Sequence, residues 1–141
     1  IQLDEQLPLG LQVIPDIDVD LELVSRDNPG FVRRPDLIVV QDAAVGRVRR
    51  DGGILRACEV LVVVEIVSPG SHRTDHVIKR GEYADAGIPH YWIVDIDPPA
   101  TLIDCHLAAE FGYQDPGPVT GRFVTTEPFP VSLRLDGLLP G

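Results

Sequence analysis

The sequence predicts an α/β (α+β) protein with a central mixed β-sheet, a flanking helix and a β-rich C-terminal part. A nearly continuous β-branched run, Val60–Val67, is typical of a central strand that is covered on both faces. A helical segment follows at 74–86, and a second buried strand follows this helix at 91–96. This order of strand, helix and strand favours a sheet with a helix packed against it.

The N-terminal part is expected to consist of strands and turns. Residues 1–24 are expected to be extended, because from Ile17 onward apolar residues alternate with acids, the period of a half-buried strand. A turn at 27–30 leads toward a second strand at 37–40. The segment 41–57 contains three glycines and several arginines, and it is predicted to be a loop or irregular.

The predicted helix at 74–86 has a start signal and a stop signal. Thr74 is a candidate N-cap, and Asp75 lies near the positive end of the helix dipole. Gly87, followed by a proline two residues later, predicts a left-handed C-cap. Beyond 91–96, proline and glycine separate strand-like pieces at 101–108, 122–126 and 131–135.

Length and composition indicate one globular domain. The chain has 141 residues, 44% of them hydrophobic, which is enough for a substantial core. It has no apolar run that could span a bilayer and no signal-peptide pattern, so we expect a soluble, cytoplasmic protein. Cys58 and Cys105 lack a metal-ligand spacing and are expected to be reduced thiols. The sequence opens at Ile1 rather than Met, which indicates a fragment or a processed form.

The charge is distributed unevenly along the chain. The net charge of −10 taken alone argues against a nucleic-acid partner. Between Arg26 and Arg80, however, ten basic residues face seven acids, a local charge of +3, and the remainder carries −13. The pattern fits either a basic surface for a polyanion or an unevenly charged solvated surface.

Two acids lie where neighbouring strands would meet. Asp36 precedes the strand at 37–40, and Glu65 lies near the end of the valine-rich strand. If these strands pair antiparallel, the two carboxylates come together at one end of the sheet core. Unpaired carboxylates among apolar side chains are costly, and Mg²⁺ would remove that cost. The alternative is that both side chains face solvent at the strand ends.

Lys79 is the only lysine, whereas the other eleven basic residues are arginines. Asp75, Lys79 and Tyr83 are spaced four apart and share one face of the predicted helix, so Lys79 could point back over the carboxylates. Val77, Gly81 and Ala84 would form the face that packs on the sheet. The alternative is a surface lysine that pairs with Asp75.

Two stretches resemble a known family. RRPDLIVV at 33–40 and VVVEIVSPGSHRTDHVIKRGEYADAGIPHYWIVDID at 62–97 resemble the Uma-two family of restriction-endonuclease-like proteins, in the PD-(D/E)XK nuclease superfamily. The resemblance covers residues 11–98 well and the tail loosely. It implies a restriction-endonuclease-like fold for one domain, 1–141, that lacks the family's N-terminal helix.

The resemblance also implies a site and an activity. Asp36 and Glu65 would bind Mg²⁺ or Mn²⁺, with the backbone carbonyl of Ile66 as a further ligand. The superfamily motif would place its lysine where Val67 stands, and in this family the lysine comes from the following helix, which matches Lys79. The implied protein is a homodimeric, metal-dependent endonuclease with DNA as substrate and Asp36, Glu65 and Lys79 as catalytic residues. The arginines expected to follow the nucleic-acid backbone are Arg33, Arg34, Arg47, Arg49 and Arg50.

Other functions fit the sequence less well. Ser68, His72 and His76 lack the G-x-S-x-G and H-E-x-x-H contexts of serine hydrolases and zinc proteases. Tyr91 and Trp92 are expected to be core aromatics. The main alternative is a non-catalytic module on the nuclease fold that acts in assembly or regulation. The acidic ends and the absent N-terminal helix favour that alternative. A nuclease fold is compatible with it, since a fold does not by itself fix a function.

Overall fold

The computed structural model describes residues 2–23, 31–67 and 73–138, and of 73–76 and 137–138 only the backbone. The predicted turn at 27–30, Ser68 and His72 lie outside these residues, as do the side chains of Thr74, Asp75 and His76. The elements run along the chain as α1 (Gln2–Glu5), β1 (Leu11–Pro15), β2 (Val19–Asp20), β3 (Val32–Arg33), β4 (Leu37–Gln41), α2 (Asp42–Asp51), β5 (Leu55–Arg56), η1 (Ala57–Glu59), β6 (Val60–Val67), α3 (Arg73–Asp85), β7 (His90–Asp95), β8 (Thr101–Leu107), η2 (Ala109–Phe111), β9 (Tyr113–Gln114), β10 (Val119–Thr120), β11 (Arg122–Thr125), β12 (Val131–Arg134) and η3 (Leu135–Leu138).

A mixed seven-stranded sheet forms the centre of the fold. Its strand order is β1-β4-β6-β7-β8-β10, with β9 paired to β8. β6 and β7 run parallel through the crossover helix α3, and the other pairs of this sheet are antiparallel. A three-stranded sheet, β3-β2-β5, and the hairpin β11–β12 complete the strands. The α+β class with a central mixed sheet, which the sequence predicts, is confirmed.

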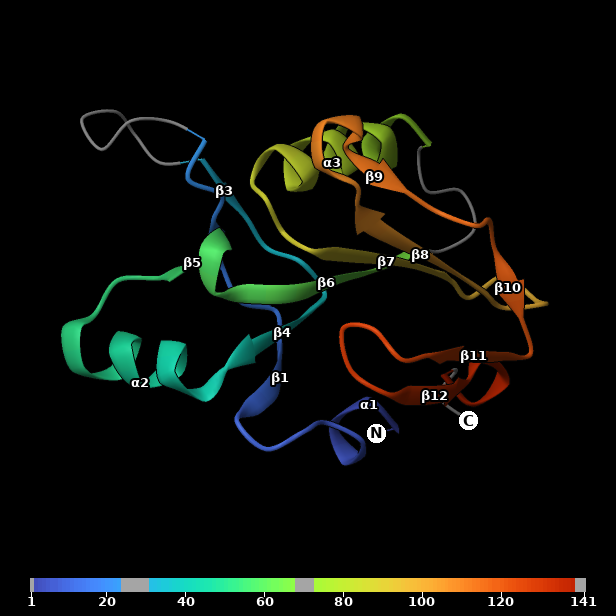
Figure 1. The fold of residues 1–141 in the computed structure, drawn as a ribbon, viewed down its shortest axis with the longest axis horizontal. Coiled ribbons are helices and arrows are strands. Elements are labelled where there is room, and N and C mark those ends of the chain that lie inside the picture. Colours follow the sequence, from blue (N-terminus) through green and yellow to red (C-terminus); the bar gives the residue numbers. More distant parts are fainter. Residues whose placement is uncertain (1, 24–30, 68–72, 139–141) are drawn as a thin grey trace.

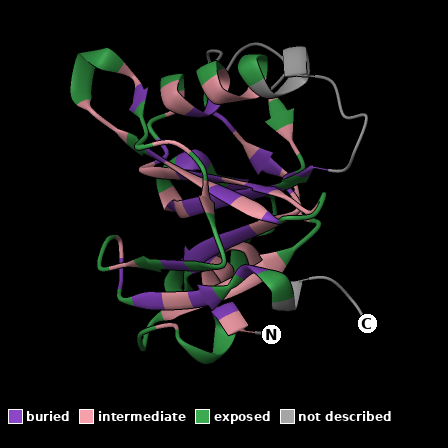
Figure 2. Ribbon diagram, turned by 90° about the vertical axis from the view of Figure 1, so that its right-hand side faces the viewer, coloured by how far each residue is buried: buried purple, intermediate pink, exposed green. Residues whose placement is uncertain are grey.

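Each face of the central sheet is covered by a different element. Figure 1 shows α3 on one side of β7 and β8 and the hairpin β11–β12 on the other. Val63 and Tyr91 belong to the core on the α3 side, whereas Val62 and Trp92 belong to the core on the hairpin side. Buried residues accordingly concentrate in the central strands, as Figure 2 shows. The β-branched run therefore forms a strand covered on both faces, and Tyr91 and Trp92 are core aromatics, both as predicted.

Helix α3 begins and ends close to the predicted positions. Gly87 has φ +80°, and its N–H donates to the carbonyl of Ala84 while the N–H of Ile88 donates to that of Tyr83. This pair of bonds is a Schellman C-cap, which confirms the predicted stop. The prediction of the buried face was wrong for Val77, which is 70% exposed, and for Gly81, which is also exposed, whereas Ala84 packs against the core as predicted and Tyr83 is fully buried. The face that carries Lys79 and Tyr83 lies against the sheet, because Tyr83 brings more apolar area than Val77 does.

The segment 41–57, predicted to be irregular, contains the ten-residue helix α2. Ala44 is buried, and Val45 and Val48 pack against the same core, which gives the segment an apolar stripe at helical spacing. Gly46 lies within this helix without breaking it, because tertiary packing outweighs the modest cost of one glycine. The glycines that end the helix are Gly52 and Gly53, both with positive φ.

The first 24 residues are only partly extended. The short helix α1 opens the described chain, and β1 and β2 follow, so the expectation of a wholly extended segment was wrong. The side-chain amide of Gln2 exchanges two hydrogen bonds with the backbone of Arg134, and that of Gln6 does the same with Ser132. The helical turn of α1 sets Gln2 and Gln6, the residue directly after the helix, four residues apart, so both side chains face the strand β12.

Two further expectations concern thiols and membranes. Cys58 is exposed, Cys105 is buried, and both are free, as expected. Burial raises the pKa of the Cys105 thiol to about 11, so this thiol stays protonated at neutral pH. Among the described residues, no helix has the length and apolar character needed to cross a membrane.

Candidate functional site

The antiparallel pairing of β4 and β6 brings the two predicted acids together. Leu37 lies opposite Val64, so the next positions along the two strands are Asp36 and Glu65. The backbone N–H of Ile66 donates a hydrogen bond to Oδ2 of Asp36, with 2.6 Å between the two atoms. The contact holds the Asp36 carboxylate against β6, at the end of the sheet where the sequence predicted the acids to meet.

Glu65 is the one charged residue that is buried among the described residues, with 5% of its surface exposed. Burial raises the pKa of its carboxyl group, and the nearby charge of Asp36 acts in the same direction. The Tyr83 hydroxyl and Lys79 lower this pKa, but burial outweighs them. A buried carboxylate with a raised pKa at a strand end is typical of functional sites.

Helix α3 contributes two side chains to Glu65. The hydroxyl of Tyr83 donates to Oε1 of Glu65 at 2.8 Å, and Nζ of Lys79 lies 3.7 Å from Oε2. The structure thus brings Asp36, Glu65 and Lys79 together, as the sequence predicted. Lys79 forms an ion pair with Glu65, whereas the alternative partner, the Asp75 side chain, lies outside the description. The hydrogen bond from Tyr83 to Glu65 was not predicted, although Tyr83 lies four residues after Lys79, the spacing that places both on one helix face.

The chemistry of the donor atoms suits a hard divalent cation. Asp36 and Glu65 supply carboxylate oxygens, and Ile66, the residue after Glu65, contacts Asp36 through its backbone N–H. Mg²⁺ binds through one or two carboxylates and keeps several waters, so a site with two acids fits it. In the part of the chain that the structure describes, no group of three or more His, Cys, Asp or Glu side chains is placed to hold a metal.

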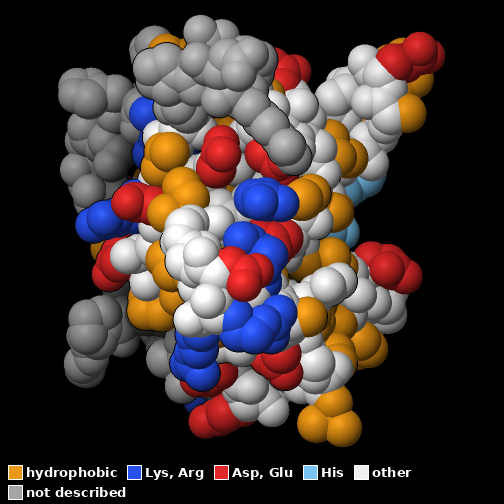
Figure 3. Space-filling model, turned by 90° about the vertical axis from the view of Figure 1, so that its left-hand side faces the viewer, with side chains coloured by type: hydrophobic (Ala, Val, Ile, Leu, Met, Phe, Trp, Pro, Cys, Tyr) orange, Lys and Arg blue, Asp and Glu red, His pale blue; other side chains and the backbone are white. Residues whose placement is uncertain are grey.

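The predicted nucleic-acid-binding arginines lie in two kinds of environment. Arg33 forms a two-pronged ion pair with Glu82, Arg34 forms one with Asp18, and Arg47 forms one with Glu59. Arg49 and Arg50 are exposed on α2. Figure 3 shows that basic and acidic side chains alternate on this face of the molecule. The basic middle segment therefore does not form a surface of one sign here.

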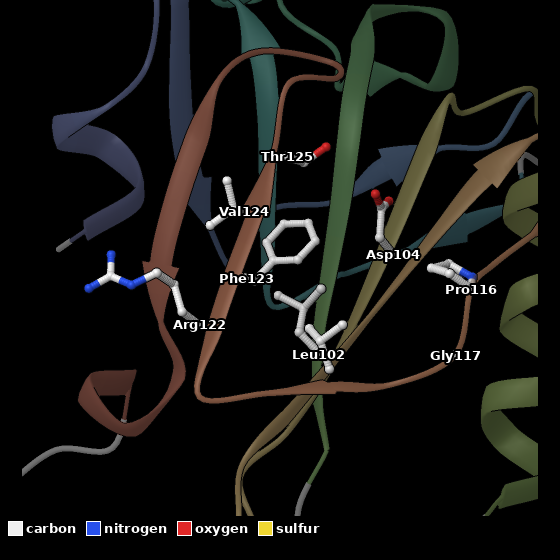
Figure 4. Close-up of a pocket in the computed structure, with 9 residues that line it drawn as sticks. Leu102, Asp104, Pro116, Gly117, Arg122, Phe123, Val124 and Thr125 are labelled. Carbon is white, nitrogen blue, oxygen red and sulfur yellow. The ribbon is translucent and has the colours of Figure 1, made fainter.

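A cavity of about 410 Å³ lies on the hairpin side of the sheet, across from Glu65. It is the space between β8, the turn that carries Pro116, and β11, as Figure 4 shows. Asp104 lines it, and Nε1 of Trp92 donates to Oδ1 of Asp104 at 2.9 Å. No local pattern in the sequence indicates this cavity, because it forms where the C-terminal hairpin folds back on the sheet. Its remaining lining residues are Leu102, Gly117, Val119, Arg122, Phe123, Val124 and Thr125.

Comparison with known proteins gives one match. The family model Uma2, described as "Putative restriction endonuclease", matches residues 3–136, nearly the whole chain. Both acids and Lys79 fall within this match. None of the curated proteins matches the chain.

Proposed function

The chain belongs to the Uma2 family, and from this premise we propose that it is a divalent-metal-dependent endonuclease that hydrolyses phosphodiester bonds in DNA. The observation that carries the proposal is the buried carboxylate of Glu65, next to Asp36 and 3.7 Å from the Lys79 ammonium. A buried acid with so little charge compensation is costly unless a cation joins it. A nuclease site needs that cation.

The side chains of Asp36 and Glu65, with the carbonyl of Ile66, would hold Mg²⁺ or Mn²⁺. When bound, such an ion lowers the pKa of a bound water and offsets charge on the phosphate. Burial of Glu65 keeps the donor oxygens in a medium of low dielectric constant, where their attraction for a cation exceeds that of exposed acids. The bond from the Ile66 N–H fixes Asp36 before the cation arrives.

Lys79 would act on the phosphate rather than on the cation. Its side chain is one-fifth exposed, so the ammonium could reach a ligand at the mouth of the site while it lies near Glu65. At that position it would orient the attacking water or offset negative charge that develops on the phosphoryl oxygens.

The same proposal assigns the five arginines to the DNA backbone. Arg49 and Arg50 are exposed and could contact phosphates directly. Arg33, Arg34 and Arg47 hold acids of the protein, so their contribution would require these ion pairs to be exchanged for phosphate contacts. We also propose that the protein is cytoplasmic and forms a homodimer. Size-exclusion chromatography with light scattering would test the oligomeric state.

Plasmid nicking tests the proposal. The wild-type protein is expected to nick supercoiled DNA with Mg²⁺ or Mn²⁺ and to stop when EDTA is added. Glu65→Ala should lower the nicking rate by at least about 100-fold, because it removes a metal ligand. Glu110→Ala, the same substitution at an exposed position in η2, is the control and should nick like the wild type. Equal rates for the wild type and Glu65→Ala would refute the assignment.

One observation favours a second function. The net charge is −10, and three of the five arginines are held by acids of the protein, which suits a non-catalytic module of assembly or regulation. Calorimetry separates the two functions. A nuclease should bind Mn²⁺ at micromolar to millimolar concentrations, whereas an absence of binding at millimolar Mn²⁺ would favour the module.

A further inference from the structure

We infer that Tyr83 is a positioning residue of the metal site: its hydroxyl holds one oxygen of Glu65 and thereby presents the other oxygen to the cation and to Lys79. The inference rests on the proposed function, because it concerns the same carboxylate. It adds a residue from α3 that touches neither the cation nor the phosphate.

The two oxygens of Glu65 have different neighbours. Oε1 accepts the hydrogen bond from Tyr83 at 2.8 Å, and Oε2 lies 3.7 Å from Nζ of Lys79. The distance to Lys79 is longer than a strong charge-assisted hydrogen bond, which would be about 2.8 Å. Oε1 is therefore the oxygen that the protein fixes, and Oε2 is the oxygen that retains capacity for a cation.

The position of the Tyr83 hydroxyl is set by packing rather than by Glu65. The Tyr83 ring is fully buried and lies edge-on to Tyr91, with 5.1 Å between the ring centroids. Its backbone carbonyl accepts the N–H of Ile88 in the C-cap of α3. The neighbouring Glu82 is held in two places by Arg33. The hydroxyl is consequently a fixed point to which the flexible glutamate side chain is attached.

Removal of this hydroxyl would leave Oε1 without its donor in a place that water reaches poorly. The Glu65 side chain is only 7% exposed, so solvent cannot readily replace the lost bond. The carboxylate would then lose the contact that fixes its orientation, which is the orientation we infer for cation binding. Groups that orient a metal ligand in this way change metal affinity by about 10- to 100-fold when they are removed.

The chain offers a matched control in Tyr113. This residue is also a buried tyrosine of the same core, and its hydroxyl donates to the carbonyl of Ile88 at 2.7 Å. Tyr113→Phe and Tyr83→Phe therefore remove the same atom, from the same kind of environment, with the loss of one hydrogen bond each. They differ in that only Tyr83 bonds to a predicted metal ligand.

The test measures Mn²⁺ binding by electron paramagnetic resonance, without nucleic acid, on the full chain. Tyr83→Phe is expected to weaken Mn²⁺ binding by about tenfold or more, whereas Tyr113→Phe should bind like the wild type. Thermal unfolding of the metal-free proteins, followed by circular dichroism, should show similar losses in midpoint for the two variants. That result would show that the difference in Mn²⁺ affinity does not come from stability.

Two results would overturn the inference while the proposed function stands. One is wild-type Mn²⁺ affinity in Tyr83→Phe, and the other is an equal loss of affinity in both tyrosine variants, which would indicate a structural effect. If the wild type itself fails to bind Mn²⁺, that result contradicts the proposed function, and with it this inference.

Discussion

One glutamate, Glu59, directly precedes strand β6 and another, Glu65, lies near the end of that strand, and the protein treats the two carboxylates in opposite ways. At the start, Arg47 donates to both oxygens of Glu59, at 2.7 and 2.8 Å, and the N–H of Arg56 adds a third bond. The hydrogen bonds from Arg47 hold the pKa of Glu59 below its ordinary value. At the other end, Glu65 receives one hydroxyl and a distant ammonium, and burial raises its pKa.

This difference separates a structural acid from an acid that is available to a ligand. A guanidinium that bonds to both oxygens satisfies a carboxylate and leaves little capacity for another cation. Among the described residues, the donor nearest to Glu65 is the neutral hydroxyl of Tyr83 and the Lys79 ammonium lies farther away, so the negative charge of Glu65 is compensated less than that of Glu59. For this reason Glu65, rather than Glu59, is the acid that we propose as a cation ligand. Glu59 instead holds Arg47 of α2 in an ion pair.

The largest expected effect concerns Lys79. Lys79→Ala should lower the metal-dependent nicking rate by about 100-fold, because it removes the cation that would offset charge on the phosphate. The thermal midpoint should change by less than about 2 °C, since the ion pair with Glu65 is long and contributes little stability. Nicking and thermal unfolding of the same preparations check both statements. A nicking rate near that of the wild type would remove Lys79 from the proposed mechanism.

A smaller effect is expected at the other end of the strand. Arg47→Ala should lower the thermal midpoint by about 4 °C, because it leaves the half-buried Glu59 without its main donor and removes a bond to the carbonyl of Ile54. Mn²⁺ affinity should stay unchanged. Arg34→Ala is the matched control, since Arg34 holds Asp18 in an exposed pair and should shift the midpoint by less than about 1 °C. A loss of Mn²⁺ binding in Arg47→Ala would contradict the division between the two ends.

The smallest effect is a pair of opposite pH dependences in the metal-free protein. The pKa of Glu59 is lowered from 4.5, so its contribution to stability is present above that pH and is lost as the pH falls. The pKa of Glu65 is raised from 4.5, so stability that is present below that pH is lost as Glu65 ionises at higher pH. Glu59→Gln should therefore lose stability relative to the wild type as the pH rises, and Glu65→Gln should gain it.

Urea unfolding with EDTA at several pH values from about 4 to about 8 measures both differences. Each is expected to be about 0.5 kcal/mol, because the Glu59 pair is partly solvated and Lys79 and Tyr83 oppose the effect of burial on Glu65. Slopes of the same sign for the two variants would show that the two carboxylates do not differ in the way described.

The sequence predicted the main strands and the meeting of Asp36 with Glu65, because short-range patterns determine both. The β-branched run at Val60–Val67 favours a central strand that is covered on both faces. Asp36 and Glu65 then come together because their strands pair antiparallel. The helix α3 was bounded correctly because Gly87 provides a local stop. These features depend on a few neighbouring residues, which a single sequence displays directly.

The errors arose where distant packing decided the outcome. Helix α2 depends on Ala44 and Val48 finding the core, whereas the local glycines and arginines indicated a loop. The buried face of α3 is set by one tyrosine that reaches Glu65, against the apolar Val77 that the sequence favoured. The parallel pair of Val19 with Leu55 joins strands far apart in the chain, and no local pattern announces it.

The side chains of Gln2 in α1 and of Gln6, directly after this helix, give β12 hydrogen-bond partners that an edge strand ordinarily lacks. Each side-chain amide supplies the donor and the acceptor that a neighbouring strand would supply, at Ser132 and at Arg134, while β11 pairs with the opposite edge. Backbone groups at an uncovered edge invite the strand of another molecule and lead to aggregation. Gln2 and Gln6 thus occupy the hydrogen-bonding positions that a further strand would use. They end the hairpin sheet at β12 and disfavour self-association through this edge.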